Sequence, residues 1–161
     1  MQIVKVQQVV AYVSPIGFHQ YAADFVKWAD RASAEPSQFF SPVPYYLYCH
    51  SIELSLKAFL LARGITKKKL KDRRYGHDLI ALLNKAKQLG LEDIVPIRPE
   101  WESELSKAND YYFHKEFEYF NVGFFANGLP LLVDLRELSQ VLIKSLKRVC
   151  LDAADAPGIP T

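Results

Sequence analysis

Cysteine is scarce in this chain of 161 residues, which contains only Cys49 and Cys150, far apart in sequence. Two distant cysteines cannot form the closely spaced framework of a disulfide-rich domain, and their spacing matches no zinc motif. Both lie in apolar segments with helical periodicity, where buried free thiols are the usual case. We therefore expect a reducing, cytoplasmic compartment.

Glycine-rich loops and long apolar runs are also missing. The seven glycines are scattered singly, so no phosphate-cradling loop and no nucleophile elbow is present, and no HExxH motif or Cys/His cluster indicates a metal. We expect neither a metal nor a cofactor. The longest apolar segment is interrupted by Glu53 and Lys57, and the N-terminus lacks the pattern of a signal peptide, so we expect a soluble protein.

Neither basic nor acidic residues are in large excess, since 20 basic and 18 acidic residues leave a net charge of +2. This balance argues against a protein that coats nucleic acid through charge alone, although a local basic patch stays compatible with it. Aromatic residues, in contrast, make up 13% of the chain. We interpret them as large core side chains, and a surface on which a ligand stacks is the alternative interpretation.

Hydrophobic periodicity predicts one all-α domain over residues 1–161, an up-and-down bundle of four to five helices. The expected helices cover residues 16–34, 44–63, 78–90, 99–118 and 130–153. Residues 1–13 would form an N-terminal arm or a short strand, residues 121–130 a loop or small hairpin, and residues 154–161 a frayed tail. In the first helix, Phe18, Tyr21, Phe25 and Trp28 follow the helical period.

The first candidate site lies in the central helix, where His50, Glu53 and Lys57 share one face. One interpretation is a Glu-Lys pair that ties this helix to a neighbour. The other is a polar cleft that meets His77 across the bundle, with Glu53 fixing the tautomer of His77 and raising its basicity. Asp78, which follows His77, would stabilise the start of the next helix.

A second candidate is the run NDYYFHKEFEY, in which a continuous helix would place Asn109, Tyr112, Glu116 and Tyr119 on one face with Lys115 nearby. Tyrosine hydroxyls and the Lys115 ammonium could face an anion or a base. The alternative is packing, with the two tyrosine rings in the core and their hydroxyls at its rim.

A third candidate is the basic segment TKKKLKDRR over residues 66–74, the best local candidate for phosphate contact. A solvated surface is the alternative interpretation of such a charge run. Its candidate phosphate ligands are Lys67, Lys68, Lys69, Arg73 and Arg74.

The run HSIELSLKAFLLARG followed by GHDLIALLNKA resembles the HEPN superfamily of helical-bundle domains, in which E-L-x-L-K-A is followed after a loop by G-H-D-L-x-x-L. The later run NDYYFHKEFEYF is similar to the family's next region, and the resemblance covers roughly residues 40–150. It implies an all-α bundle that tends to form a homodimer. Many HEPN proteins are RNA-cutting toxins or defence factors, and others are non-catalytic modules that bind nucleotides or proteins.

The ribonuclease branch of that superfamily is marked by an arginine, four to six residues, and then a histidine. This spacing is missing here, and the nearest approach, from Arg73 to His77, is too short and lies in the wrong segment. We therefore predict a binding or regulatory module in a toxin-antitoxin or defence system, with nucleotide, RNA or the protein product of a neighbouring gene as its partner.

Two alternatives stay open. One is a metal-independent ribonuclease that uses His77 as general base, with Lys57 or Lys115 stabilising the charge that develops on the phosphate. The other is a purely structural oligomerisation domain.

Overall fold

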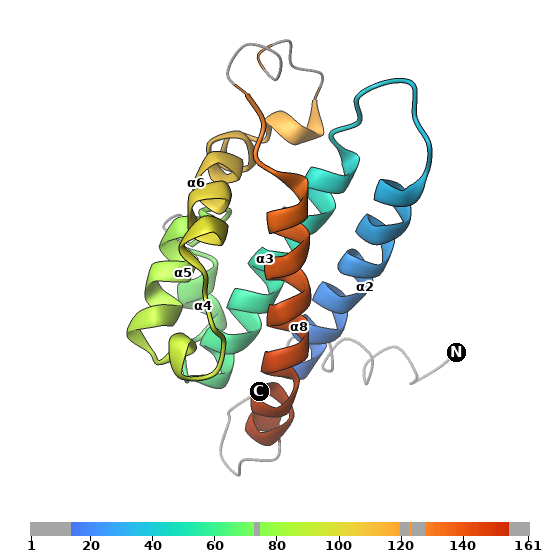
Figure 1. The fold of residues 1–161 in the computed structure, drawn as a ribbon. Coiled ribbons are helices and arrows are strands. Elements are labelled where there is room, and N and C mark those ends of the chain that lie inside the picture. The colour runs from blue at the N-terminus through green and yellow to red at the C-terminus, as the bar shows by residue number, and fades with distance from the viewer. Residues whose placement is uncertain (1–13, 73–74, 120–122, 124–127, 155–161) are drawn as a thin grey trace, which may run out of the picture.

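A computed structural model describes residues 14–72, 75–119, 123 and 128–154, and every regular element within these ranges is helical (Figure 1). The α-helices are α2 (Pro15–Ala34), α3 (Val43–Ala62), α4 (Lys67–Leu70), α5 (Leu79–Gln88), α6 (Pro99–Phe113) and α8 (Leu132–Ala154). Two short 3₁₀ helices, η1 (Leu91–Asp93) and η2 (Glu116–Glu118), follow α5 and α6. The all-α prediction is confirmed.

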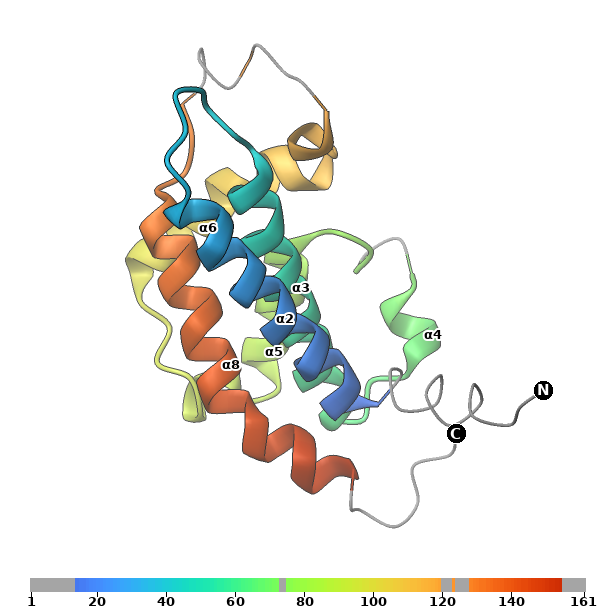
Figure 2. The same cartoon turned by 90° about the vertical axis from the view of Figure 1, so that its right-hand side faces the viewer.

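Helix α3 lies at the centre of the bundle. It packs against α2 and α8 on one side and against α5 and α6 on the other (Figures 1 and 2). In Figure 1, α2 runs upwards while α3 and α8 run downwards. Apolar residues surround most of the α3 cylinder, which is the pattern of a buried helix. Its fully buried side chains include Tyr48, Ile52, Leu56, Phe59 and Leu60.

Local sequence signals explain most helix ends. The Ser14 hydroxyl accepts a hydrogen bond from the Gly17 amide at 3.0 Å, so Ser14 caps α2. Helix α3 begins at Val43 with Pro42 at the N-cap position, and the Ser41 hydroxyl accepts a hydrogen bond from the Val43 amide at 3.3 Å. Gly64 follows α3 with φ of +87°, a left-handed conformation that glycine adopts without strain.

The aromatic stripe of α2 does not form the buried face of that helix. The residues that face α3 and α8 are small, among them Ala22, Val26 and Ala29, and they let the helices approach closely. Tyr21 and Trp28 are instead 45% and 52% exposed. The interpretation of the aromatics as core residues is therefore wrong for these two.

Two predicted segments differ from the structure. Residues 67–70 form a helical turn, α4, because the Thr66 hydroxyl accepts a hydrogen bond from the Lys69 amide and Leu70 is buried. Helix α6 ends at Phe113 rather than near Glu118, because Lys115 adopts a left-handed φ of +59°, which interrupts the helical hydrogen bonds.

Several predictions fall on residues outside the described ranges. These are the arm at 1–13, the tail beyond residue 154, and most of the loop at 121–130. Within that loop, Gly128 is described and has a left-handed φ of +72°, which glycine adopts without strain.

Candidate functional site

A buried carboxylate, that of Glu53 in the middle of α3, lies at the centre of a polar cluster. Glu53 is only 2% exposed. Its Oε1 accepts a hydrogen bond from Lys57 Nζ at 2.5 Å, and its Oε2 accepts one from the Tyr112 hydroxyl at 2.5 Å. His77 Nδ1 lies 3.1 Å from the same Oε2. The sequence prediction that His77 meets Glu53 across the bundle agrees with this geometry.

The Gly76-His77-Asp78 loop is fixed to the bundle by three consecutive contacts. The Gly76 carbonyl accepts a hydrogen bond from Lys57 Nζ at 2.9 Å, and the His77 ring is bonded to Glu53. Asp78 caps α5, since its Oδ1 accepts hydrogen bonds from the amides of Ile80 and Ala81 at 3.1 and 3.0 Å. Each residue of this triplet thus has a structural role.

Asn109 of α6 connects the start of α5 to the neighbouring helix. Its side-chain oxygen accepts a hydrogen bond from the Leu79 amide at 2.8 Å, and its amide nitrogen donates to Asp78 Oδ1 at 3.2 Å. The side chain therefore satisfies one of the free amides at the first turn of α5. The predicted helical face of Asn109 and Tyr112 does point into the bundle.

His50 belongs to the cluster as well. Its Nδ1 lies 2.8 Å from the Tyr112 hydroxyl and 3.7 Å from Glu53 Oε2. Because the Tyr112 hydroxyl gives its only hydrogen to Glu53, its oxygen must accept the hydrogen of His50 Nδ1. The His50 ring also stacks on Tyr46 and meets the ring of Phe25 edge-on. These contacts fix its tautomer and leave Nε2 as an acceptor.

The electrostatics of the cluster keep Glu53 charged. Burial alone raises the pKa of a carboxyl, but here His50, Lys57 and Tyr112 outweigh it and hold the pKa of Glu53 at about 2. Burial, together with the charge of Glu53, raises the pKa of Tyr112 far above its ordinary value. The centre is therefore a carboxylate surrounded by donors, with a neutral tyrosine.

The chemistry that this cluster can perform is limited. The His77 side chain is half exposed, and donation from Nδ1 to Glu53 leaves its Nε2 as a basic nitrogen. Lys57 uses two of its three ammonium hydrogens on Glu53 and the Gly76 carbonyl, and its side chain is 13% exposed. The cluster can position an imidazole, but its lysine already has partners inside the fold.

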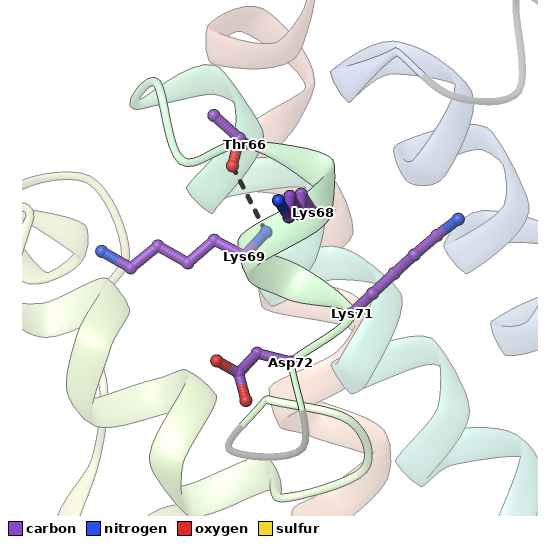
Figure 3. Close-up of a pocket in the computed structure, with 5 residues that line it drawn as sticks. All are labelled: Thr66, Lys68, Lys69, Lys71 and Asp72. Carbon is purple, nitrogen blue, oxygen red and sulfur yellow. Dashed lines mark hydrogen bonds between the residues drawn. The ribbon is translucent and has the colours of Figure 1, made fainter.

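The basic segment lies apart from these contacts, on and after α4. Lys67, Lys68, Lys69 and Lys71 are all exposed. Thr66, Lys68, Lys69, Lys71 and Asp72 line a shallow depression of about 470 Å³. Figure 3 shows that the ammonium groups of the three labelled lysines point in different directions rather than towards one point. Arg73 and Arg74 lie outside the described residues.

The remaining predicted residues do not join the cluster by any described contact. Because α6 ends at Phe113, the helical face expected to carry Glu116 and Tyr119 beside Tyr112 does not exist, and that expectation is wrong. Tyr119 is 69% exposed. Lys115 is exposed and occupies the left-handed turn between α6 and η2.

The spacing of three positions placed His50 on the same helical face as Glu53, as predicted. The contact of His50 with Tyr112 of α6 was not predicted, because it joins residues far apart in the sequence. For a second buried acid, Glu104, no sequence pattern predicted a structural role. It is held by Lys107 at 2.6 Å and by the Leu131 amide at 2.7 Å, so it fixes the chain that enters α8.

Two further properties of the described residues bear on function. No group of three or more histidine, cysteine, aspartate or glutamate residues in the described part of the chain is placed to hold a metal ion. Among the described helices, none combines the length and the apolar character that a membrane crossing requires.

The fold and the cluster define a small all-α domain whose central helix carries a buried Glu-Lys pair bonded to a Gly-His-Asp loop. The model of the HEPN domain family matches residues 45–151, a range that includes all of these features. The chain belongs to the HEPN family. Comparison with curated proteins and with solved structures gave no match.

Proposed function

We propose that this chain is a HEPN module that binds RNA through Lys67, Lys68, Lys69 and Lys71 without cleaving it. The observation that supports the proposal most is the divergence of the ammonium groups around α4 (Figure 3). A site for a single phosphate needs donors that converge on one anion, whereas lysines that spread around a helical turn can each reach a different phosphate of a polyanion. This favours RNA over a mononucleotide.

The state of the Glu53 cluster supports the absence of cleavage. Lys57 is one of the two lysines considered for stabilising a developing phosphate charge, and its ammonium is bonded to Glu53 and to the Gly76 carbonyl. The other, Lys115, lies in the turn between α6 and η2 and joins the cluster by no described contact. Tyr112 is committed in the same way as Lys57, because its hydroxyl donates to Glu53 and accepts from His50. The cluster then acts as an anchor for the bundle and the His77 loop.

The experiment is a fluorescence anisotropy titration of a labelled single-stranded RNA. The test variant carries Lys67→Gln, Lys68→Gln and Lys69→Gln. The matched control carries Lys144→Gln, Lys147→Gln and Arg148→Gln, which removes the same charge from exposed positions of α8. We expect the test variant to bind roughly tenfold more weakly or worse and the control to stay near wild type.

A second arm separates RNA from nucleotide. Mononucleotide at the same total phosphate concentration should displace little of the labelled RNA, because each phosphate is held by few contacts. Equal weakening by both triple variants would show that only net charge matters and would contradict the proposed segment. Efficient displacement by the mononucleotide would point to a nucleotide site instead.

A ribonuclease centred on His77 is the second candidate function. The observation in its favour is the His77–Glu53 pair, which leaves a basic Nε2 on a half-exposed ring. Incubation of unlabelled mixed RNA with wild type and with His77→Ala decides between the two. Cleavage that His77→Ala abolishes, with the helical circular dichroism unchanged, would favour this second function.

The biological setting that we propose is a toxin-antitoxin or defence system in the cytoplasm. Family membership supports the setting, and the two buried free thiols, Cys49 and Cys150, suit a reducing compartment. Co-expression with the neighbouring gene products, followed by affinity purification, tests it. Retention of a neighbour's product through a salt wash is the expected result.

A further inference from the structure

A groove with aromatic walls lies between α2 and α3. It has a volume of about 330 Å³ and is lined by Phe18, Tyr21, Phe25, His50 and Leu54. The polar groups among these five residues are the Tyr21 hydroxyl and the His50 imidazole, and none of the five is acidic. Walls of this kind suit a flat, uncharged ring that stacks on aromatic side chains.

His50 gives the groove an acceptor for a hydrogen bond. Its Nδ1 lies 2.8 Å from the Tyr112 hydroxyl, to which it donates, so Nε2 carries a lone pair and no hydrogen. The ring is fixed in place, because it stacks on Tyr46 and meets Phe25 edge-on. A ligand in the groove therefore has an acceptor for an N–H group, and every nucleobase carries such groups on its pairing edge.

Exposed aromatic side chains continue beyond the groove along α2. Tyr21 is 45% exposed, and Trp28, which follows Phe25 on the same stripe, is 52% exposed. The Arg31 guanidinium lies over the Trp28 ring at 4.8 Å. Aromatic rings beside cationic side chains are the usual means by which proteins hold single-stranded nucleic acid. This row favours a strand of bases over an isolated ring compound.

The groove opens on the side of the bundle where α4 lies. Helix α8 packs against both α2 and α3, so the open side of that pair faces away from α8. Figure 2 shows α4 beyond α3 on this same side. From Leu54 to the end of α3 is about 12 Å, and α4 begins soon after, at Lys67. A stripe of partly exposed positions leads along α3 from the groove, namely His50, Leu54, Lys57 and Leu61.

We propose that the α2–α3 groove takes an unpaired base of the RNA whose phosphates contact the lysines of α4, an inference that rests on the function proposed above. Lysine contacts to phosphate do not distinguish one nucleic acid from another. A base enters the groove only when it is free of a pairing partner, so the groove selects single-stranded RNA. The lysines supply attraction, and the aromatic groove supplies the preference for unpaired bases.

Fluorescence anisotropy with two labelled RNA strands of equal length, one normal and one whose nucleotides lack bases, tests the groove. We expect wild type to bind the normal strand roughly tenfold more tightly than the abasic strand. Tyr21→Ala removes a wall and Leu54→Trp fills the groove, so each should lose this preference. Tyr21→Phe keeps the ring and should stay near wild type.

Two controls accompany these variants. Phe39→Ala removes an aromatic side chain that is 82% exposed outside the groove, and it should bind like wild type. Duplex RNA offers no unpaired base, so Tyr21→Ala and Leu54→Trp should bind it as wild type does. Circular dichroism should show every variant folded.

The salt dependence separates this inference from the proposed function. Loss of a base contact releases no counterion, so Tyr21→Ala should weaken binding to the normal strand without changing the slope of log affinity against log salt concentration. Weaker binding by the α4 triple variant, with Tyr21→Ala and Leu54→Trp unchanged, would overturn the base site and leave the proposed function standing. Equal losses on the normal and abasic strands would also overturn it. Unchanged binding by the α4 triple variant would instead contradict the proposed function.

Discussion

At the scale of single residues, Glu53 decides how the Gly-His-Asp loop sits on the bundle. It is a charged group on the helix with the most complete apolar surroundings, and its two oxygens accept from Lys57, Tyr112 and His77. A buried charge is tolerable only when its partners remain in place, and removing one member leaves the others desolvated without compensation.

The first prediction follows for Glu53→Gln. The substitution keeps the shape of the side chain but leaves the Lys57 ammonium without its anion, so we expect the free energy of unfolding to fall by about 3–5 kcal/mol. Urea denaturation measures this. Glu35→Gln, at an exposed position after α2, should change stability by less than about 0.5 kcal/mol. Equal effects of the two substitutions would show that the cluster contributes nothing particular.

The pKa of Glu53 gives a pH-dependent prediction. Its pKa is lowered from 4.5 to about 2 by folding. The stabilisation from its ionised form is therefore fully present above pH 4.5 and is lost as the pH falls towards 2. We expect the stability of wild type to decline across this window more steeply than that of Glu53→Gln, as followed by urea denaturation at several pH values. Parallel curves would contradict the assignment.

At the scale of elements, the start of α5 and the end of α6 are the two places where single residues set a boundary. Asp78 gives α5 a side-chain cap and a link to Asn109, whereas Lys115 ends α6 by adopting a left-handed backbone conformation. The first boundary was readable from Asp78 ahead of an amphipathic stripe. The second was not, because lysine ordinarily favours helix.

The α5 boundary predicts that Asp78→Ala destabilises the protein by about 1–2 kcal/mol. The amides of Ile80 and Ala81 would lose their acceptor, so hydrogen exchange should accelerate at the first turn of α5 while the core of α3 stays protected. Asp78→Asn, which retains a capping oxygen, should lose less stability than Asp78→Ala. Uniform acceleration across the whole chain would show that the cap is not a local feature.

At the end of α6, Lys115→Gly is predicted not to lower the stability of the protein, in contrast to Asp78→Ala. A non-glycine residue at φ of +59° is strained by about 1 kcal/mol, and glycine removes that strain at the expense of a more flexible unfolded chain. Lys115→Gly should thus be neutral or slightly stabilising in thermal denaturation, and Lys115→Val clearly destabilising. A stability loss on Lys115→Gly would mean that the lysine side chain itself is needed there.

Some features of the structure could be predicted from the sequence and others could not. The central position of α3 followed from periodicity, and the Glu53–His77 contact was one of the two interpretations that the spacing left open. The small-residue packing of α2 could not be predicted, because a helical period in Phe18 and Phe25 looks the same whether that stripe faces a core or flanks it. Partners distant in sequence, such as Glu104 and Leu131, leave no local pattern.

At the scale of the whole molecule, the bundle separates its charged groups into two kinds. Glu53 is buried, and the donors around it form hydrogen bonds within the protein. The lysines around α4 are exposed, and their side chains point in different directions (Figure 3). A protein with a net charge of +2 has little long-range attraction for nucleic acid. Binding of RNA must then depend on this local segment.

The salt dependence of RNA binding tests that claim most directly. Each phosphate contact with a single strand contributes a slope of about −0.7 to the plot of log affinity against log salt concentration. We predict that Lys67→Gln/Lys68→Gln/Lys69→Gln flattens the slope by about 2 relative to wild type, while the α8 control triple variant keeps the wild-type slope. An unchanged slope in the α4 variant, or no RNA binding by wild type even at low salt, would contradict it.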